Sequence, residues 1–146
     1  MKINVPVIIQ DKDSKNCAPC TLKSILDYYK IENSLDTLIK QCSPNKRGTS
    51  PEKTIKCGLE YGLFFIPIPL DNHKDFDDAV ETALQSKWPV MISLETAKGN
   101  HLCVIKGFDE RFYYFSDPFA GEHKRTRGET WFLAQNRYAN AVLLLE

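Results

Sequence analysis

Residues 16–29 read NCAPCTLKSILDYY, a stretch that sets a cysteine at the start of a predicted helix. Pro19 suits a first helical turn, where the backbone N–H that proline lacks would have no partner. Apolar side chains then recur at helical spacing, at Leu22, Ile25, Leu26 and Tyr29. Unpaired N–H groups and the positive end of the helix dipole stabilise a thiolate at such a position. The sequence therefore predicts that Cys17 is a nucleophile, and a thiol nucleophile needs a base.

The candidate base is His101, at the start of a predicted strand. Residues 101–108 and 112–117 are rich in β-branched and aromatic side chains, and the three residues between them are typical of a tight turn. We therefore expect a β-hairpin. A three-residue loop centred on Glu110 pairs His101 with Phe119 and leaves Asp117 within diagonal reach on the same face. A two-residue loop would put His101 and Asp117 on opposite faces.

A carboxylate beside an imidazole orients the ring and supports its protonated form, as the third member of a catalytic triad does. Cys17, His101 and Asp117 form a candidate constellation of this kind. The chemistry it predicts is acyl transfer to a thiolate, with peptide hydrolysis as the outcome and no cofactor or metal required. The structural alternative for Asp117 is that it ends a strand and starts a turn before Pro118.

Length and composition favour one domain that spans residues 1–146. The chain has 146 residues, 42% of them hydrophobic, which suffices for one packed core. Lys+Arg and Asp+Glu each number 19 and the largest basic block is residues 123–125, so nucleic-acid binding is disfavoured. No apolar run approaches the ~20 residues of a membrane span. Five cysteines without a secretory signal favour a soluble protein with reduced thiols in a cytosol.

The predicted elements run from helices to strands, an α+β layout with a cleft where the layers meet. After the helix that starts at Cys17, we expect helices at about 35–41, 51–61, 76–86 and 130–137, and strands at about 63–68, 89–94, 101–108, 112–117 and 138–145. Ser34 and Ser50 are the expected caps of the second and third helices, and Gly62 is expected to end the third. The N-terminal helical half should pack on a C-terminal antiparallel β-sheet.

Several features together resemble a known family. Gln10 precedes Cys17 in CAPCTL, Gly48-Thr49 precede the third helix, His101 opens an apolar strand, and Asp117-Pro118 end the next one. This set resembles the papain-like cysteine peptidases that process bacteriocin and other peptide precursors, and the resemblance runs from Gln10 to the last strand. In that family the peptidase is usually the N-terminal domain of a peptide-exporting ABC transporter and cuts leader peptides after a double glycine.

The resemblance implies a papain-like fold and a role for each of four residues. Cys17 would be the nucleophile, His101 the base, Asp117 the orienting carboxylate and Gln10 an oxyanion-hole donor. The implied substrate is a peptide or protein, such as a leader peptide, and the implied partner is an ABC transporter. The implied location is the cytoplasm, either free or on the cytoplasmic side of a transporter.

Other functions stay open. A papain-like fold can act as a toxin or effector, that is, as a protease, deamidase or acyltransferase on another protein. A binding-only module could recognise a precursor without cutting it, although the complete Cys, His and Asp set disfavours this. Cys17 and Cys20 also form a C-x-x-C motif, but thioredoxin-like motifs follow a buried apolar strand, whereas the residues before Cys17 are polar. A zinc site lacks a second close Cys or His pair.

Five further expectations concern the surroundings of this candidate site. Cys20 should point into the core, the remaining cysteines (Cys42, Cys57 and Cys103) should be small buried residues, and His73 and His123 should lie in polar loops. A channel that admits only glycine should be narrow, and the aromatic residues at 112–115 are the expected walls. An apolar groove for an amphipathic leader helix is expected on the helical half, near Leu35, Leu38 and Ile39.

Overall fold

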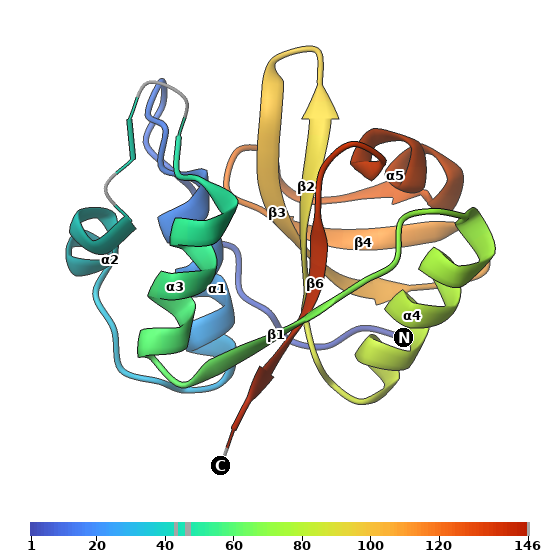
Figure 1. The fold of residues 1–146 in the computed structure, drawn as a ribbon, viewed down its shortest axis with the longest axis horizontal. Coiled ribbons are helices and arrows are strands. Elements are labelled where there is room, and N and C mark those ends of the chain that lie inside the picture. Colours follow the sequence, from blue (N-terminus) through green and yellow to red (C-terminus); the bar gives the residue numbers. More distant parts are fainter. Residues whose placement is uncertain (43, 46–47, 146) are drawn as a thin grey trace.

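The computed structural model of this protein describes residues 1–42, 44–45 and 48–145. Its elements are α1 (Cys17–Tyr28), α2 (Leu35–Cys42), α3 (Pro51–Glu60), β1 (Leu63–Pro67), α4 (His73–Gln85), β2 (Val90–Thr96), β3 (Gly99–Phe108), β4 (Phe112–Asp117), β5 (Gly121–Thr126), α5 (Arg127–Ala134) and β6 (Ala139–Leu144). The strands form an antiparallel sheet in the order β1-β6-β2-β3-β4-β5. Figure 1 shows α1, α2 and α3 together on one side of the sheet and α4 and α5 on the other. The predicted α+β class is therefore confirmed.

Helix α1 is anchored to the sheet at both ends. Its apolar face is fully buried, as the helical spacing predicted, at Leu22, Ile25 and Leu26. The Thr21 hydroxyl donates a hydrogen bond of 3.2 Å to the Leu102 carbonyl on β3. Beyond the last turn, the Tyr29 hydroxyl donates to the Val142 carbonyl on β6 at 2.7 Å. Because both ends are tied to strands, Cys17 in the first turn has a defined position relative to β3.

The starts of three helices are set by capping side chains. Ser50 accepts a hydrogen bond from the third N–H of α3, and Pro51 follows it, so this helix begins where the sequence predicted. Helices α4 and α5 each begin three residues before their predicted starts. Asn72 and Thr126 accept the equivalent N–H hydrogen bonds there. The prediction was late because it placed each start close to the first apolar residues instead of at the cap.

The helices of this protein are short and amphipathic. The longest, α4, has 13 residues, and its inward-facing Val80, Ala83 and Leu84 are buried as predicted. In the described part of the chain, no helix combines the length and the hydrophobicity that crossing a membrane requires.

Strand β5 was not predicted from the sequence. Its residues, GEHKRT, lack the apolar alternation of a half-buried strand, although they alternate between half-buried and exposed positions. An edge strand of a sheet is often polar, and β5 is the edge strand next to β4. The pairing sets His123 opposite Phe115 and Gly121 opposite Asp117. The prediction that His123 lies in a loop is therefore wrong, as it is for His73, the first residue of α4.

The β3–β4 hairpin has the predicted face pattern but not the predicted loop. Next to the turn, the pairing is one residue off the register that a loop centred on Glu110 would give. A β-bulge between Ile105 and Gly107 shifts the register back, so the strands pair as expected beyond it. His101 and Asp117 therefore lie on the same face, as predicted, through a bulge that the sequence analysis did not foresee.

The N-terminal segment, residues 1–10, runs along the sheet toward the end of β4 that carries Asp117. The Ser116 hydroxyl donates to the Val5 carbonyl at 2.7 Å. Further along, the Gln10 N–H donates to the carbonyl of Pro118 at 2.8 Å. Since Pro118 follows Asp117 directly, these bonds place Gln10 beside the end of β4.

Candidate active site

Cys17 is the first residue of α1, as the sequence predicted. The Asn16 side chain makes no capping hydrogen bond to this helix, so it does not compete for the first N–H groups. Interactions with the His101 side chain and with the backbone of Leu102 lower the pKa of the Cys17 thiol, so both groups lie beside its sulfur. Thr21 binds the carbonyl of that same Leu102. The Leu102 residue of β3 thus holds both the thiol and the helix that carries it.

His101 joins the thiol to a carboxylate. Its Nε2 atom is hydrogen-bonded to Oδ1 of Asp117. Because Nε2 is engaged there, Nδ1 is the ring nitrogen available to Cys17. The structure therefore brings Cys17, His101 and Asp117, three of the four predicted site residues, together at one place.

The Asp117 carboxylate is 2% exposed and both of its oxygen atoms are hydrogen-bonded. In addition to the His101 ring, Oδ1 accepts the backbone N–H groups of Phe119, at 2.8 Å, and Ala120, at 3.1 Å. Oδ2 accepts a hydrogen bond of 2.8 Å from Nε2 of His123 on β5. A second histidine, which was not predicted from the sequence, therefore touches the site.

Register arithmetic could have found His123. If residues 118–120 are taken as a three-residue turn after β4, the next strand pairs Gly121 with Asp117 and His123 with Phe115, which is the pairing observed. The polar composition of this segment hid that signal.

The groups of the site shift one another's pKa values. Burial alone would raise the pKa of the Cys17 thiol, but the hydrogen bonds to His101 and Leu102 outweigh it and lower the pKa. Burial alone would lower the pKa of His101, but the hydrogen bonds to Asp117 and Cys17 raise it to about 9. At Asp117 burial is again outweighed, by His101 and His123, and the carboxyl pKa lies well below its usual range. The site therefore favours the thiolate of Cys17 and the imidazolium of His101 over the neutral forms of both groups.

Gln10, the fourth predicted residue, lies near the site, and its side-chain amide is turned toward the loop that leads from Gln10 to Cys17. Its Nε2 donates to the Ser14 carbonyl at 3.0 Å and lies 3.5 Å from the Ser14 hydroxyl. Among the described residues, its Oε1 atom and the Thr49 hydroxyl are buried polar atoms without a hydrogen-bond partner. Gly48, before Thr49, approaches the Lys15 carbonyl, so this segment lies beside the loop that leads to Cys17.

The walls of the site differ from those expected. Tyr113 and Phe115 are fully buried and belong to the core. The other two aromatic residues of 112–115 lie toward the hairpin turn, at the opposite end of β4 from Asp117. The exposed aromatic ring beside the site is Phe119, which is 55% exposed and meets the His101 ring edge-on with 6.0 Å between centroids.

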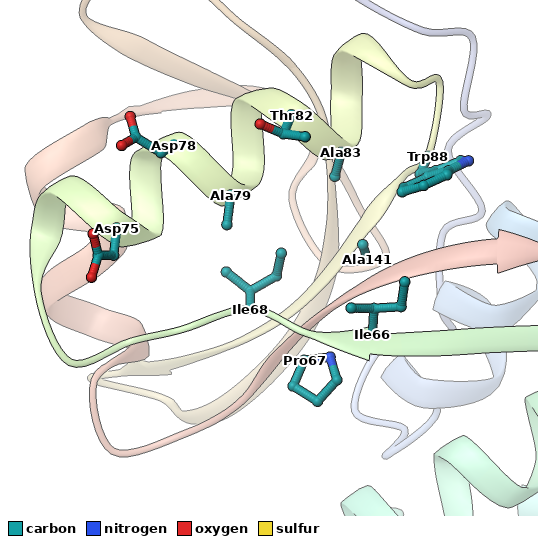
Figure 2. Close-up of a pocket in the computed structure, with 10 residues that line it drawn as sticks. All are labelled: Ile66, Pro67, Ile68, Asp75, Asp78, Ala79, Thr82, Ala83, Trp88 and Ala141. Atoms are coloured by element: carbon teal, nitrogen blue, oxygen red, sulfur yellow. The ribbon is translucent and has the colours of Figure 1, made fainter.

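Leu38 is fully buried and so cannot line the groove expected on the helical half, whereas Leu35 and Ile39, expected beside it, are half-buried. An open groove of about 450 Å³ lies instead between α4 and the end of β1 (Figure 2). Its lining residues are Ile66, Pro67, Ile68, Asp75, Asp78, Ala79, Thr82, Ala83, Trp88 and Ala141. Figure 2 shows the two carboxylates toward one end and Trp88 toward the other. This lining includes neither Cys17 nor any group that contacts it.

The other cysteines are core residues, as predicted. All five cysteines lie in the described part of the chain as free thiols, and Cys17 alone is partly exposed. Burial raises the pKa of Cys20 to about 11 and that of Cys103 well above its usual value. Cys42 and Cys57 are buried against each other, with 3.7 Å between their sulfur atoms.

A cysteine at a helix N-terminus, beside a histidine on a strand of an antiparallel sheet, is the arrangement typical of a papain-like cysteine peptidase. Residues 2–142 match the Peptidase_C39 like family, and the chain belongs to that family.

Solved structures with the same fold include peptidases linked to transporters. A double glycine motif protease from an AMS/PCAT transporter, in complex with the leader peptide, has a TM-score of 0.77 and 23% identity, covering 99% of this chain and 94% of that one. The peptidase domain of Streptococcus ComA, a bifunctional ABC transporter of a quorum-sensing pathway, has a TM-score of 0.72 and 17% identity, covering 97% and 98%. A C39-like peptidase from Bacillus anthracis has a TM-score of 0.74 and 16% identity, covering 100% of both chains. No curated protein matches the chain.

Proposed function

We propose that this cysteine peptidase cleaves a peptide precursor after a double-glycine leader. The observation that carries the proposal is the meeting of Cys17, His101 and Asp117, with a hydrogen bond between His101 and Asp117, a lowered thiol pKa and a raised imidazole pKa. In this proposal Cys17 is the nucleophile, His101 is the general base and acid, Asp117 orients the imidazole, and Gln10 is an oxyanion donor.

The first half of the proposed reaction forms an acyl-enzyme. The Cys17 thiolate attacks the scissile carbonyl carbon, so that a C–S bond forms and an electron pair moves to the carbonyl oxygen. The Cys17 backbone N–H and the Gln10 amide stabilise this oxyanion, and the dipole of α1 adds to their field. For this, one Gln10 hydrogen must turn from the Ser14 hydroxyl to the substrate oxygen. The His101 imidazolium then protonates the amide nitrogen, the C–N bond breaks, and the C-terminal product leaves as an amine.

The second half of the proposed reaction hydrolyses the thioester. Neutral His101 takes a proton from water as the water oxygen attacks the acyl carbon. The C–S bond then breaks and the electron pair returns to sulfur, so the leader leaves as a carboxylic acid and the thiolate–imidazolium pair is restored. Throughout, Asp117 keeps the Nε2–H of His101 in place and supports each protonated state of the ring.

Two arguments support specificity for a double-glycine leader. The first is the likeness to solved structures of the same fold, and the second is the steric exclusion of larger side chains. One solved structure of the same fold holds a leader peptide, and another is a domain of an ABC transporter. A site rejects larger side chains by steric clash more readily than it attracts a residue without a side chain. The exposed Phe119 ring beside His101 is one source of such a clash. We infer a leader-bearing peptide as the substrate and the cytoplasmic side of a peptide exporter as the place where the protein works.

A set of leader peptides tests this proposal. Peptides with Gly-Gly, Ala-Gly and Val-Gly before the cleavage point are incubated with the protein, and the products are identified by mass. We expect cleavage after Gly-Gly and Ala-Gly, and a rate for Val-Gly lower by about two orders of magnitude. Cys17→Ala should abolish all cleavage, whereas Cys20→Ala should keep it because that thiol is fully buried.

The outcomes separate the alternatives. Equal rates on Val-Gly would contradict a narrow channel. If no leader is cut while a glutamine-containing protein is deamidated or an unrelated protein is cleaved, a toxin or effector function replaces leader processing. A leader that binds without being cut would instead favour a binding-only module.

A further inference from the structure

Asp117 is shared by two histidines, one on each of its oxygen atoms. Oδ1 accepts from His101 and from two backbone N–H groups of the turn after β4. Oδ2 has His123 Nε2 as its hydrogen-bond partner, at 2.8 Å. A carboxylate only accepts hydrogen bonds when ionised, so both imidazoles must carry a proton on Nε2.

His123 is held in this position by its own strand and by an aromatic ring. Its partner in the β4–β5 register is Phe115, and the two rings are stacked with 4.9 Å between centroids and 9° between planes. Phe115 itself is fully buried. The stacking fixes the plane of the imidazole, and the strand pairing fixes its position along β4. Rigid elements of the sheet therefore direct Nε2 toward Asp117.

We propose that His123 is a positioning residue for the peptidase reaction: by holding Oδ2 of Asp117, it keeps Oδ1 aligned with His101. The inference that this affects turnover rests on the proposed function. The effect on the Cys17 and His101 pair does not, because it concerns the folded protein alone.

The burial of Asp117 makes this contact important. With 2% exposure, a carboxylate oxygen that loses its donor has little access to water and remains an unsatisfied buried charge. The carboxylate can then recover a partner by turning, which draws Oδ1 away from His101. In either case the imidazolium of His101 loses support, and with it the thiolate of Cys17.

Each of the two histidines faces a small set of charged groups. His101 faces Asp117 and Cys17. His123 faces Asp117 on β4 and lines a shallow pocket with four further charged residues, which are Lys2, Lys106, Glu122 and Lys124. Of these, Lys106 and Glu122 form an ion pair with each other. The neutral Nε2–H form of His123 donates to Asp117 as the charged form does, so the proposed role requires no extra charge.

Three substitutions separate the donor from the packing. His123→Phe keeps a ring on Phe115 but removes the N–H. His123→Gln restores an amide N–H at about the reach of Nε2, and His123→Asn carries the same amide one carbon shorter. His73→Phe is the matched control, because His73 is also stacked on an aromatic ring, Trp131, and also lies beside a carboxylate, at 3.1 Å from Asp77.

Each variant is assayed in three ways on the full chain. Cleavage of the Gly-Gly peptide gives kcat and KM, the rate of iodoacetamide labelling of Cys17 is followed from pH 5 to 10, and thermal unfolding reports stability. We expect His123→Phe to lower kcat roughly tenfold at nearly constant KM, the effect of one hydrogen bond to a charged group. Its labelling profile should shift toward that of an ordinary thiol. His123→Gln should recover most of both losses, and His73→Phe should show neither.

Wild-type kcat and labelling in folded His123→Phe would overturn the proposal. So would equal losses in His123→Gln and His123→Phe with normal melting temperatures, because the donor would then be irrelevant. If His123→Phe does not fold, the comparison of Gln with Asn decides, since recovery by Gln alone supports a donor at the reach of Nε2. If the wild-type protein cuts no leader peptide, the proposed function fails, while the labelling profiles still test the role of His123.

Discussion

At Cys17, burial and hydrogen bonding act on the thiol in opposite directions, and hydrogen bonding prevails. We predict that iodoacetamide labels Cys17 before the other four cysteines near neutral pH, because its lowered pKa favours the thiolate and its side chain is partly exposed. Labelling should stay fast below the ordinary thiol pKa of about 8.5, since His101, with a pKa of about 9, remains protonated there. Peptide mapping by mass after timed labelling measures this order.

Two variants test the cause of that reactivity. His101→Ala removes the imidazolium and should slow labelling at pH 6 by one to two orders of magnitude, roughly the effect of restoring an ordinary thiol pKa. Cys20→Ala should leave the labelling of Cys17 unchanged. Cys57 is the competitor, because the hydrogen bond with Cys42 lowers its pKa, but its 4% exposure keeps the reagent away. Labelling of Cys57 ahead of Cys17 would contradict the prediction.

At the scale of elements, the bulge in β3 couples the hairpin to the N-terminal segment. Gly107 pairs with Lys2, and a Cβ at this glycine would lie 2.5 Å from the Met1 carbonyl oxygen. Gly107→Ala must therefore push the segment away from the sheet. We expect a loss of about 1–3 kcal/mol in the free energy of unfolding, and a lower kcat because the same segment carries Gln10. Urea denaturation and peptide cleavage measure the two effects.

Gly128 provides the control for this substitution. A Cβ at this position on α5 would meet His73 Cε1 at 3.8 Å, which is an ordinary contact. Alanine also favours a helix over glycine, so Gly128→Ala should keep or raise stability. Equal losses in the two variants would show that the close approach at Gly107 is not the cause.

The elements that the sequence predicted well are those with a periodic apolar pattern. The burial of α1 and the existence of β3 and β4 followed from such patterns, because packing against one core requires them. Strand β5 was missed because its edge position allows a polar sequence. The predicted starts of α4 and α5 were three residues too late, because each helix begins directly after its capping residue and not at its first apolar residue.

The parts of the candidate site that could be predicted are those that depend on residue type and on which face of the hairpin a side chain occupies. The contact of His101 with Asp117 required only that both share one face of the hairpin, and the bulge corrected a wrong loop. The contact of His123 with Asp117 required a strand that the sequence hides. The catalytic roles of these residues stay predictions, which the variants above test.

At the scale of the whole molecule, the site is a network of titratable groups that joins α1, β3, β4 and β5. Cys17, His101, Asp117 and His123 come from these four elements and meet only in the folded chain. An unfolded chain would leave each group at its ordinary pKa. Folding stability must therefore depend on pH through this network.

Asp117→Asn isolates that dependence. The Asp117 pKa is lowered on folding despite burial, so its contribution is present above its unfolded pKa of about 3.9 and is lost as the pH falls toward the folded value. The His101 pKa is raised on folding to about 9, so its contribution is full below its unfolded pKa of about 6.5 and is lost as the pH rises through 9. The two windows overlap between about pH 4 and 6.5.

We therefore predict that the difference in Tm between the wild-type protein and Asp117→Asn is largest between about pH 4 and 6.5 and shrinks on both sides. Each kcal/mol of coupling corresponds to about 3 °C for a chain of this length. The Asn amide also meets the N–H groups of Phe119 and Ala120, which costs stability because an amide accepts hydrogen bonds less well than a carboxylate. This loss of stability is independent of pH, so it shifts the Tm difference by the same amount at every pH. Circular dichroism melts from pH 3 to 10 measure the difference. A difference that stays constant across this range would mean that Asp117 and His101 do not share a charge interaction in the folded protein, and the thiolate at Cys17 would then need another source of support.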